Sequence, residues 1–435
     1  MRFHSTKNKN IEVSLKEAIF NSLPSDNGLF VPNFIPKLTN DFIKNISNYS
    51  LQEIAQTVSY TLLKDDITKA QLDDIVETSI NFPVSLVNIH DNIYSLELFH
   101  GPTMAFKDFG ARFMAKLMSY FLGHENKKIT ILVATSGDTG SAVANSFLGI
   151  EEVEVIILYP SGKISDIQEK QLTTLGQNIT ALEIKGTFDD CQKLVKESFL
   201  DQDLNSKLNL SSANSINISR LIPQSFYYFY AYSQLNDKDV VFSVPSGNFG
   251  NLSAGILAKK MGLPINLFIA ATNINDIIPQ YLKTGIFTPH PSKQTIANAM
   301  DVGNPSNFAR LYYFYHGDIS KIRQDIVGFS YTDDQIRNII KKISDSYGYI
   351  MDPHGATGYM ALIDYMKNTN NTNFNGVFLE TAHPAKFKDE VDKILGTNIE
   401  FPERLLTVLK KEKVSIKLNP KFDEFKDFLI NYHSY

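Results

Sequence analysis

Short apolar runs alternate with helix-like patterns through most of this chain, and this alternation limits its possible folds more than any other feature. Residues 129–134, 153–159 and 179–184 are candidates for buried strands, and a helical pattern follows each of them. The alternation restarts at residues 240–244 and 265–271. Strands that alternate with helices predict a mostly parallel sheet with both faces covered. We therefore predict an α/β fold with two open, mostly parallel modules in succession.

The N-terminal part of the chain has a different pattern. It contains three candidates for amphipathic helices, at residues 15–23, 50–63 and 68–80. Ser14 is placed to cap the first of them, and Glu17 completes a capping box. The predicted organisation is a mainly helical N-terminal domain over residues 1–88, a first α/β module over 89–235 and a second over 236–435. Ligands of such folds bind beyond the carboxyl ends of the strands.

Composition argues against several classes of function. A net charge of −5 over 435 residues does not suit nucleic acid as the main partner. No apolar stretch approaches the ~20 residues of a membrane span. Cys191 is the single cysteine, so no internal disulfide can form, as is typical of a reducing compartment. We expect a cytoplasmic protein with a small-molecule substrate and no metal site. The sequence leaves monomer and homodimer open.

Lys107 is the strongest candidate for a catalytic residue. It lies in F-K-D-F-G, between an apolar approach at residues 101–106 and an apolar helix-like run at 111–121. Desolvation by these flanks favours a neutral amine, and a neutral lysine can form a Schiff base with a carbonyl cofactor. Alternatively, Lys107 pairs with Asp108 at the start of a solvated helix. The loops that follow the predicted strands bear on this choice.

One of those loops suits a phosphate group. The segment Ser246 to Asn251, S-G-N-F-G-N, follows a strand and opens a helix. Glycines let the backbone approach a ligand closely, and successive amides at a helix N-terminus hold a phosphate dianion. The loop lacks the Lys and Ser/Thr of a nucleotide-binding P-loop and the third glycine of a dinucleotide fingerprint. A tight turn without a ligand is the alternative reading.

A second loop, T-S-G-D-T-G at residues 135–140, occupies the same position after an earlier strand. Its hydroxyls and amides suit a small carboxylate, while capping of the next helix is the alternative. Asp138 is unfavourable beside an anion, so we expect its side chain to point away from the ligand, where it could cap that helix.

Three further segments carry polar groups at ends of elements. Asn214, Ser215 and Arg220 precede or open a long aromatic helix predicted over residues 220–235, and the planar guanidinium of Arg220 could clamp a second phosphate. A salt bridge at the helix start is the alternative. Thr381 ends the last predicted strand and could offer a hydroxyl to a ring nitrogen. His383 has the surroundings of a structural turn residue, and the role of His354 stays open.

Taken together, these motifs closely resemble the threonine synthase family of pyridoxal-phosphate enzymes, in the branch with a long N-terminal extension. The resemblance covers nearly the whole chain. The segments that carry it include G-L-F-V-P, F-H-G-P-T-M-A-F-K-D-F-G, T-S-G-D-T-G, N-S-I-N-I-S-R, V-P-S-G-N-F-G-N, N-A-M-D-V-G-N-P-S-N and T-A-H-P-A-K-F. The resemblance implies the fold of the tryptophan-synthase-β type, also called fold type II.

The resemblance also implies roles for individual residues. Lys107 is then the lysine that carries pyridoxal phosphate. The other cofactor-binding residues would be Gly247, Asn248, Phe249, Gly250 and Asn251, with Thr381 facing the pyridine nitrogen. Thr135, Ser136, Gly137 and Thr139 would receive the substrate carboxylate, and Asn214, Ser215 and Arg220 the substrate phosphate. Related enzymes often have Asn in place of Asp138, which leaves the role of this carboxylate open.

The implied reaction converts O-phospho-L-homoserine and water to L-threonine and phosphate, by γ-elimination followed by addition of water at Cβ. The nearest alternative is another lyase of this fold, such as a dehydratase or a phospho-lyase acting on a related amino-acid phosphate. An alternative of another class is a phosphate-binding α/β protein without enzymatic activity. That alternative predicts a colourless protein, whereas a lysine-linked cofactor absorbs visible light.

Overall fold

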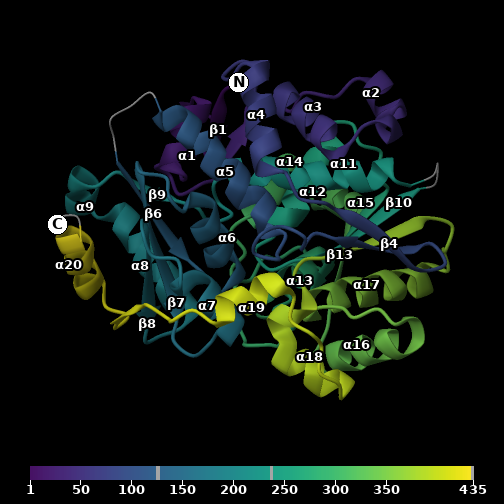
Figure 1. The fold of residues 1–435 in the computed structure, drawn as a ribbon. Helices are drawn as coiled ribbons and strands as arrows, with labels where there is room; N and C mark the ends of the chain where they lie inside the picture. Colours follow the sequence, from purple (N-terminus) through teal and green to yellow (C-terminus); the bar gives the residue numbers. More distant parts are fainter. Residues whose placement is uncertain (124–127, 236–238, 433–435) are drawn as a thin grey trace.

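Three sheets organise the chain in a computed structural model, which describes residues 1–123, 128–235 and 239–432 (Figure 1). The largest has six strands in the order β12-β11-β10-β13-β5-β4. The second has five strands in the order β14-β8-β7-β6-β9 and is wholly parallel. In the six-stranded sheet only the β4–β5 pair is antiparallel. The prediction of an α/β fold with mostly parallel sheets is confirmed.

The predicted strands form at or near the expected residues. Their side chains are buried, which accounts for the apolar runs in the sequence. The five-stranded sheet contains β6 (Ile129–Ala134), β7 (Val153–Pro160), β8 (Ile179–Ile184), β9 (Leu210–Ser212) and β14 (Ile416–Leu418). The six-stranded sheet contains β4 (Ser85–His90), β5 (Ile93–Glu97), β10 (Val240–Pro245), β11 (Leu267–Thr272), β12 (Ile326–Ser330) and β13 (Asn375–Glu380).

Helices pack around both parallel sheets, as crossover connections require. Between β5 and β9 they are α5 (Lys107–Leu122), α6 (Asp138–Phe147), α7 (Asp166–Thr173), α8 (Phe188–Leu200) and α9 (Gln202–Lys207). Between β10 and β13 they are α12 (Gly250–Lys260), α13 (Ile277–Thr284), α14 (Phe308–Phe314), α15 (Ile319–Asp325), α16 (Asp333–Tyr347) and α17 (Pro353–Thr369). The last three are α18 (Lys388–Leu395), α19 (Glu403–Leu409) and α20 (Phe422–Tyr432).

Two strands connect segments that are far apart in the sequence. β5 pairs with β13, with Glu97 opposite Glu380, although their residues are almost three hundred positions apart. β14, near the C-terminus, pairs with β8, and α20 packs beside α8 at the left of Figure 1. The predicted boundary between the two modules adjoins residues 236–238, which lie outside the described residues.

The N-terminal segment contains the predicted helices and a small sheet. Its helices are α1 (Leu15–Asn21), α2 (Asn40–Lys44), α3 (Leu51–Leu63) and α4 (Lys69–Ser79). Ser14 and Glu17 form the predicted capping box. The sheet, in the order β2-β1-β3, is antiparallel and consists of β1 (Phe3–Ser5), β2 (Glu12–Val13) and β3 (Phe30–Pro32). Strands of two or three residues are too short to produce a readable alternation, so the sequence did not predict them.

The long aromatic helix predicted over residues 220–235 is wrong in its continuity. The structure has α10 (Ile218–Leu221), a 3-10 turn at Ile222–Ser225 and α11 (Phe226–Ser233). Pro223 lies in the middle of this interruption and has no backbone N–H to continue an α-helix. The break places Arg220 at the end of a short buried helix. Within the described residues, no helix has the length and apolar character to cross a membrane.

Candidate functional site

A pocket collects most of the residues that the sequence singled out. It is lined by the loops that follow β5, β6, β9, β10 and β13, so it draws on both parallel sheets. Carboxyl ends of parallel strands are the expected position for such a site. The predicted site residues that line it are Lys107, Thr135, Ser136, Thr139, Asn214, Ser215, Arg220, Gly247, Asn248, Phe249, Gly250, Asn251 and Thr381. Gly137 lies just outside this lining.

Lys107 is the first residue of α5, and its Nζ faces the pocket. The side chain is 14% exposed, and its Nζ lies 3.8 Å from Oδ2 of Asp138. The ring of Phe106 lies beside it, with its centroid 5.2 Å from Nζ. Burial lowers the pKa of Lys107 below its ordinary value, while the Asp138 carboxylate opposes that shift. The predicted apolar surroundings of this amine are therefore present.

Backbone contacts between two loops bring Lys107 close to Thr381. The loop before α5 follows β5, and Thr381 follows β13, which is the neighbouring strand. The N–H of Phe106 donates to the carbonyl oxygen of Thr381 at 2.9 Å, and Ala105 forms a β-bridge with Ala382. A separate antiparallel contact beyond the parallel β5–β13 pairing thus fixes where α5 begins.

The loop from β10 to α12 has the geometry of a backbone anion site. Phe249 adopts a left-handed conformation with φ of 60° and immediately precedes the first turn of α12. Asn248 holds the loop in place, because its Oδ1 accepts from the N–H of Ser306 at 2.5 Å and its Nδ2 donates to Ser215 Oγ at 2.6 Å. A helix N-terminus behind a fixed glycine loop favours a phosphate dianion.

Gly247 has no room for a side chain. A Cβ there would lie 2.5 Å from the carbonyl oxygen of Ala299 and 2.8 Å from Cα of Met300. We expect Gly247→Ala to lower cofactor affinity at least about tenfold, because one of these two backbones has to move. Cofactor retained after dialysis, read from visible absorbance, measures the effect. Far-ultraviolet circular dichroism tests whether the fold is kept.

Gly250→Ala is the matched control for this prediction. A Cβ at Gly250 would meet Ser215 Cβ at 3.3 Å and Asn307 Nδ2 at 3.4 Å, so side chains have to give only slightly. Its effect on cofactor retention should be clearly smaller than that of Gly247→Ala. Equal retention by wild type and Gly247→Ala would contradict the assignment of this loop.

Asn251, in the first turn of α12, presents an unused donor to the same pocket. Its Oδ1 accepts from the hydroxyls of Tyr227 and Tyr228 at 2.7 and 2.6 Å, which fixes the orientation of the amide. Its buried Nδ2 has no hydrogen-bond partner among the described residues. A buried donor without a partner is costly, and a bound acceptor group would remove that cost.

The T-S-G-D-T-G loop differs in detail from the prediction. Oγ of Thr135 accepts from the N–H groups of Gly137 and Gly140 at 2.9 and 2.8 Å, so its acceptor capacity holds the loop in shape. Ser136 and Thr139 are partly exposed to the pocket instead. The expectation that Asp138 points away and caps the helix is wrong. Gly137 is the N-cap, and the Asp138 carboxylate faces the pocket because Lys386 neutralises it.

Arg220 is buried at the edge of the pocket and has an unused donor. Its side chain is almost wholly enclosed, and its Nη1 donates to the carbonyl oxygen of Ala213 at 2.5 Å. Its Nε has no partner in the part of the chain that the structure describes. Burial lowers the pKa of Arg220 to about 10, so the guanidinium stays charged at neutral pH. The buried carboxyl of Asp108 is the nearby group that favours this charge. A planar guanidinium that lines a pocket suits an anion.

The neighbouring amide and hydroxyl hold loops together. Nδ2 of Asn214 donates to the carbonyl oxygen of Ala134 at 2.8 Å, and Oγ of Ser215 accepts from Asn248 and Asn307. Arg310 provides a contrast with Arg220. It is equally buried, but all its donors with described contacts bind chain oxygens, those of Phe30, Ser215, Ile216 and Asn307. Arg310 therefore has a structural environment.

The two histidines of uncertain role have structural contacts. Nδ1 of His354 bonds to the Asp352 carboxylate, and its Nε2 accepts from the N–H of Ala299 at 3.2 Å, although the ring lines the pocket. His383 caps the 3-10 helix Pro384–Phe387 through Nδ1, and burial lowers its pKa to about 4. The prediction that His383 is a structural turn residue agrees with this geometry.

Sequence reasoning missed several residues of the site. Two of them bind the Asp138 carboxylate, namely Lys386 and Gln168. Three others line the pocket, namely Asn298, Met300 and Asp301. Burial raises the pKa of Asp301 to about 7, although Thr295 and Asn273 donate to its carboxylate. The segments that contain Asp301 and Lys386 already carried the family resemblance, and that was the only signal for them in the sequence.

Comparison with known proteins identifies the class of this site. The family model described as "Pyridoxal-phosphate dependent enzyme" matches residues 85–373. Models of the threonine synthase N terminus and C-terminal region match residues 2–80 and 355–429. The chain is thus a pyridoxal-phosphate-dependent enzyme.

Full-length relatives narrow this class further. Threonine synthase of Haemophilus influenzae is 44% identical over 99% of this chain and 100% of its own length. The crystal structure of threonine synthase from Escherichia coli, 40% identical, matches with a TM-score of 0.94 over 99% of this chain and 100% of that one. PLP-bound threonine synthase from Brucella melitensis, 33% identical, has a TM-score of 0.92 over 99% of both chains. This chain belongs to the threonine synthase family.

The residues present in the pocket fit pyridoxal phosphate. Lys107 offers an amine with lowered pKa, and the Gly247 loop offers a close backbone approach that a Cβ would block. Asn251 offers a buried amide donor that is otherwise unsatisfied. A carbonyl group, a phosphate and a polar ring substituent can all find partners here.

Proposed function

We propose that this protein converts O-phospho-L-homoserine and water to L-threonine and phosphate. The observation that carries the proposal is the coexistence of two anion-binding positions in one pocket with Lys107. One is the backbone loop at residues 247–250, and the other is the buried guanidinium of Arg220. A phosphorylated cofactor and a phosphorylated substrate need two such positions.

The first of these positions, together with its surroundings, is assigned to the cofactor. Lys107 carries it through Nζ, and the amides of Gly247, Asn248, Phe249 and Gly250 hold its phosphate. Asn251 and Thr381 bind polar atoms of its ring. The support is that all of these residues line the pocket and that the Asn251 amide is oriented by two tyrosines.

The second position is assigned to the substrate. Ser136 and Thr139, partly exposed in the T-S-G-D-T-G loop, bind the substrate carboxylate, and Thr135 and Gly137 keep that loop in shape. Arg220 binds the substrate phosphate through its guanidinium, which lines the pocket. Asn214 and Ser215 fix the backbone next to it.

The bound cofactor supplies an electron sink for negative charge that develops on the substrate carbon. Lys107 Nζ takes a proton from Cα and releases it before it takes another from Cβ, and its lowered pKa favours the neutral amine that each of these steps needs. The released protons go to Cγ, from which phosphate has left, and back to Cα after water has added at Cβ. Arg220 stabilises the negative charge of the phosphate as it leaves from Cγ. The Thr381 hydroxyl at the ring nitrogen would leave that nitrogen without a proton, because a hydroxyl can donate to it.

The test is to incubate the purified protein with O-phospho-L-homoserine and measure two products. We expect phosphate and L-threonine to be released in equal amounts. Release of phosphate together with a keto acid, and no threonine, would instead show a lyase of the same fold with another outcome. Lys107→Ala, treated identically, controls for contaminating phosphatase.

We also propose that residues 1–88, 89–235 and 236–435 act as three units. Exchange of β5 and β14 between the two larger sheets would couple the second and third units.

We also propose a cytoplasmic location. The Cys191 thiol is buried, and burial raises its pKa to about 12, so this single cysteine is chemically inert.

A further inference from the structure

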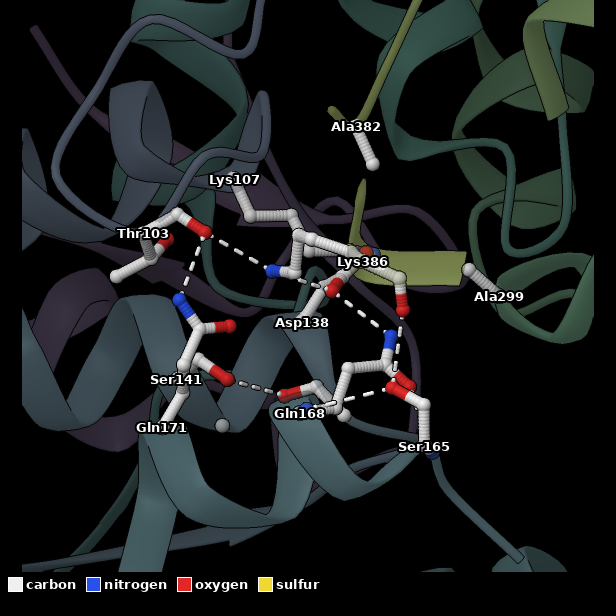
Figure 2. Close-up of polar contacts among 12 residues, drawn as sticks. Thr103, Lys107, Asp138, Ser141, Ser165, Gln168, Gln171, Ala299, Ala382 and Lys386 are labelled. Atoms are coloured by element: carbon white, nitrogen blue, oxygen red, sulfur yellow. Dashed lines mark hydrogen bonds and ion pairs between the residues drawn. The ribbon is translucent and has the colours of Figure 1, made fainter. Parts of the chain in front are cut away.

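A second lysine is buried behind the candidate cofactor lysine. Lys386 lies in the 3-10 helix Pro384–Phe387, which follows β13, and its side chain is 0% exposed. Its Nζ contacts Oδ1 of Asp138 at 2.7 Å and donates to the carbonyl oxygen of Thr103 at 2.9 Å (Figure 2). A lysine is almost never fully buried unless it is paired, so this position needs a reason.

Asp138 links the two lysines. Its Oδ1 accepts from Lys386 and from Nε2 of Gln168 at 2.9 Å, while its Oδ2 lies 3.8 Å from Nζ of Lys107. Burial opposes ionisation of this carboxyl, but the charges of Lys386 and Lys107 outweigh it and hold the pKa of Asp138 well below its usual range. One carboxylate therefore faces two amines at unequal distances.

Neighbouring polar groups hold Asp138 and Lys386 in place. Gln171 donates to the same Thr103 carbonyl oxygen at 3.1 Å, and Ser165 donates to the carbonyl oxygen of Lys386 at 3.1 Å. Figure 2 shows these side chains around Asp138, with Gln168 and Gln171 extending from α7. Gln168 of α7 thus holds the Asp138 carboxylate, and Ser165, the N-cap residue of α7, holds the backbone of Lys386.

Charges of both signs face Lys107. Asp138 and Asp352 favour its protonated form, whereas Lys386 and Arg220 disfavour it, and burial disfavours it most. An amide at position 138 would supply hydrogen bonds without charge and would need no buried lysine. An acid at this position requires a nearby cation, and Lys386 is the cation in direct contact with it.

We propose that Asp138 and Lys386 are positioning residues that act as one charge-balanced unit and control the protonation of the Lys107 nitrogen. This inference rests on the proposed role of Lys107 as the cofactor-bearing residue. Asp138 supplies a carboxylate that attracts a proton to Lys107, and Lys386 weakens that attraction. Each partner alone would bias Lys107 in the opposite direction.

The experiment is a pH titration of the visible absorbance of the bound cofactor, in wild type, Asp138→Asn, Lys386→Met and the double variant. The midpoint reports the proton affinity of the linked nitrogen and does not depend on turnover. We expect Asp138→Asn to lower the midpoint and Lys386→Met to raise it, each by about 1 pH unit or more. The double variant should lie between the single variants and near wild type.

Lys386→Met leaves a buried carboxylate uncompensated and can prevent folding. In that case Asp138→Asn and the double variant still test the proposal, because the titration midpoint of the double variant should be higher than that of Asp138→Asn. Lys426→Met is the matched control, since Lys426 pairs with Asp201 outside the pocket, and its midpoint should equal that of wild type. Identical midpoints in all folded variants, or single variants that shift in the same direction, would overturn the proposal.

Borohydride reduction and peptide mapping on each variant separate this inference from the assignment beneath it. An adduct on Lys107 together with unchanged midpoints overturns only the role of Asp138 and Lys386. An adduct elsewhere overturns both. Threonine release by the wild-type protein is scored independently of either result.

Discussion

Lys107→Ala should lose the covalently bound cofactor and reduce turnover by more than about 10⁴-fold, the upper range for proton transfer by a positioned side chain. The physical reason is that Lys107 has both tasks in the proposed reaction, holding the cofactor and moving protons at the substrate. Its Nζ is the amine that lines the pocket with a lowered pKa. Visible absorbance measures the first loss, and threonine release measures the second.

Lys386 is the alternative lysine against which this prediction can be tested. It is a second buried lysine within the same polar network, so it is the best alternative site of attachment. Its Nζ already contacts Asp138 and the Thr103 carbonyl oxygen, whereas the Nζ of Lys107 lies 3.8 Å from the Asp138 carboxylate, a longer contact. Peptide mapping after borohydride should find the adduct on Lys107. An adduct on Lys386 would contradict the assignment.

Arg220→Ala should lower kcat/KM by roughly 30-fold to several-thousand-fold. Truncation of one partner of a buried charge pair costs roughly 2–5 kcal/mol, and Arg220 is a buried guanidinium that lines the pocket. Cofactor content should remain near that of wild type, because the cofactor phosphate is assigned to the loop at residues 247–250. Steady-state kinetics and absorbance measure the two quantities separately.

Two conservative variants sharpen this test. Arg220→Lys keeps the charge but loses the planar guanidinium, so we expect partial rescue. Arg310→Lys is the matched control, because Arg310 is a buried arginine whose guanidinium binds chain oxygens. Arg310→Lys should lower the midpoint temperature of thermal unfolding. It should leave substrate affinity nearly unchanged. Loss of cofactor with unchanged substrate affinity in Arg220→Ala would mean that the two phosphate positions are reversed.

The features predicted best from the sequence are local. The strand at Ile129–Ala134 occupies the predicted residues, and Ser14 with Glu17 forms the predicted capping box. These elements depend on side-chain periodicity and on contacts three residues apart. Such interactions are encoded by neighbouring residues, so a sequence shows them directly.

Elements that depend on distant partners were missed, and one local signal, the proline at position 223, was misread. The antiparallel sheet at Phe3–Ser5 exists only because Phe30–Pro32 pairs with it. Continuity of the helix after Arg220 failed at Pro223, where the missing N–H outweighed the apolar pattern. The exchange of β14 into the sheet of β8 could not be predicted, because many strand orders satisfy the same alternation.

By itself the sequence determined the α/β class, the candidate lysine and the glycine loop, because each is a local pattern of residue types. The tertiary structure alone decided that Asp138 faces the pocket and that Lys386 neutralises it. These two residues are almost 250 positions apart in the chain, and they meet only because two loops at the ends of different sheets converge. The charge state of a buried group depends on its neighbours in space, and sequence order does not specify those neighbours.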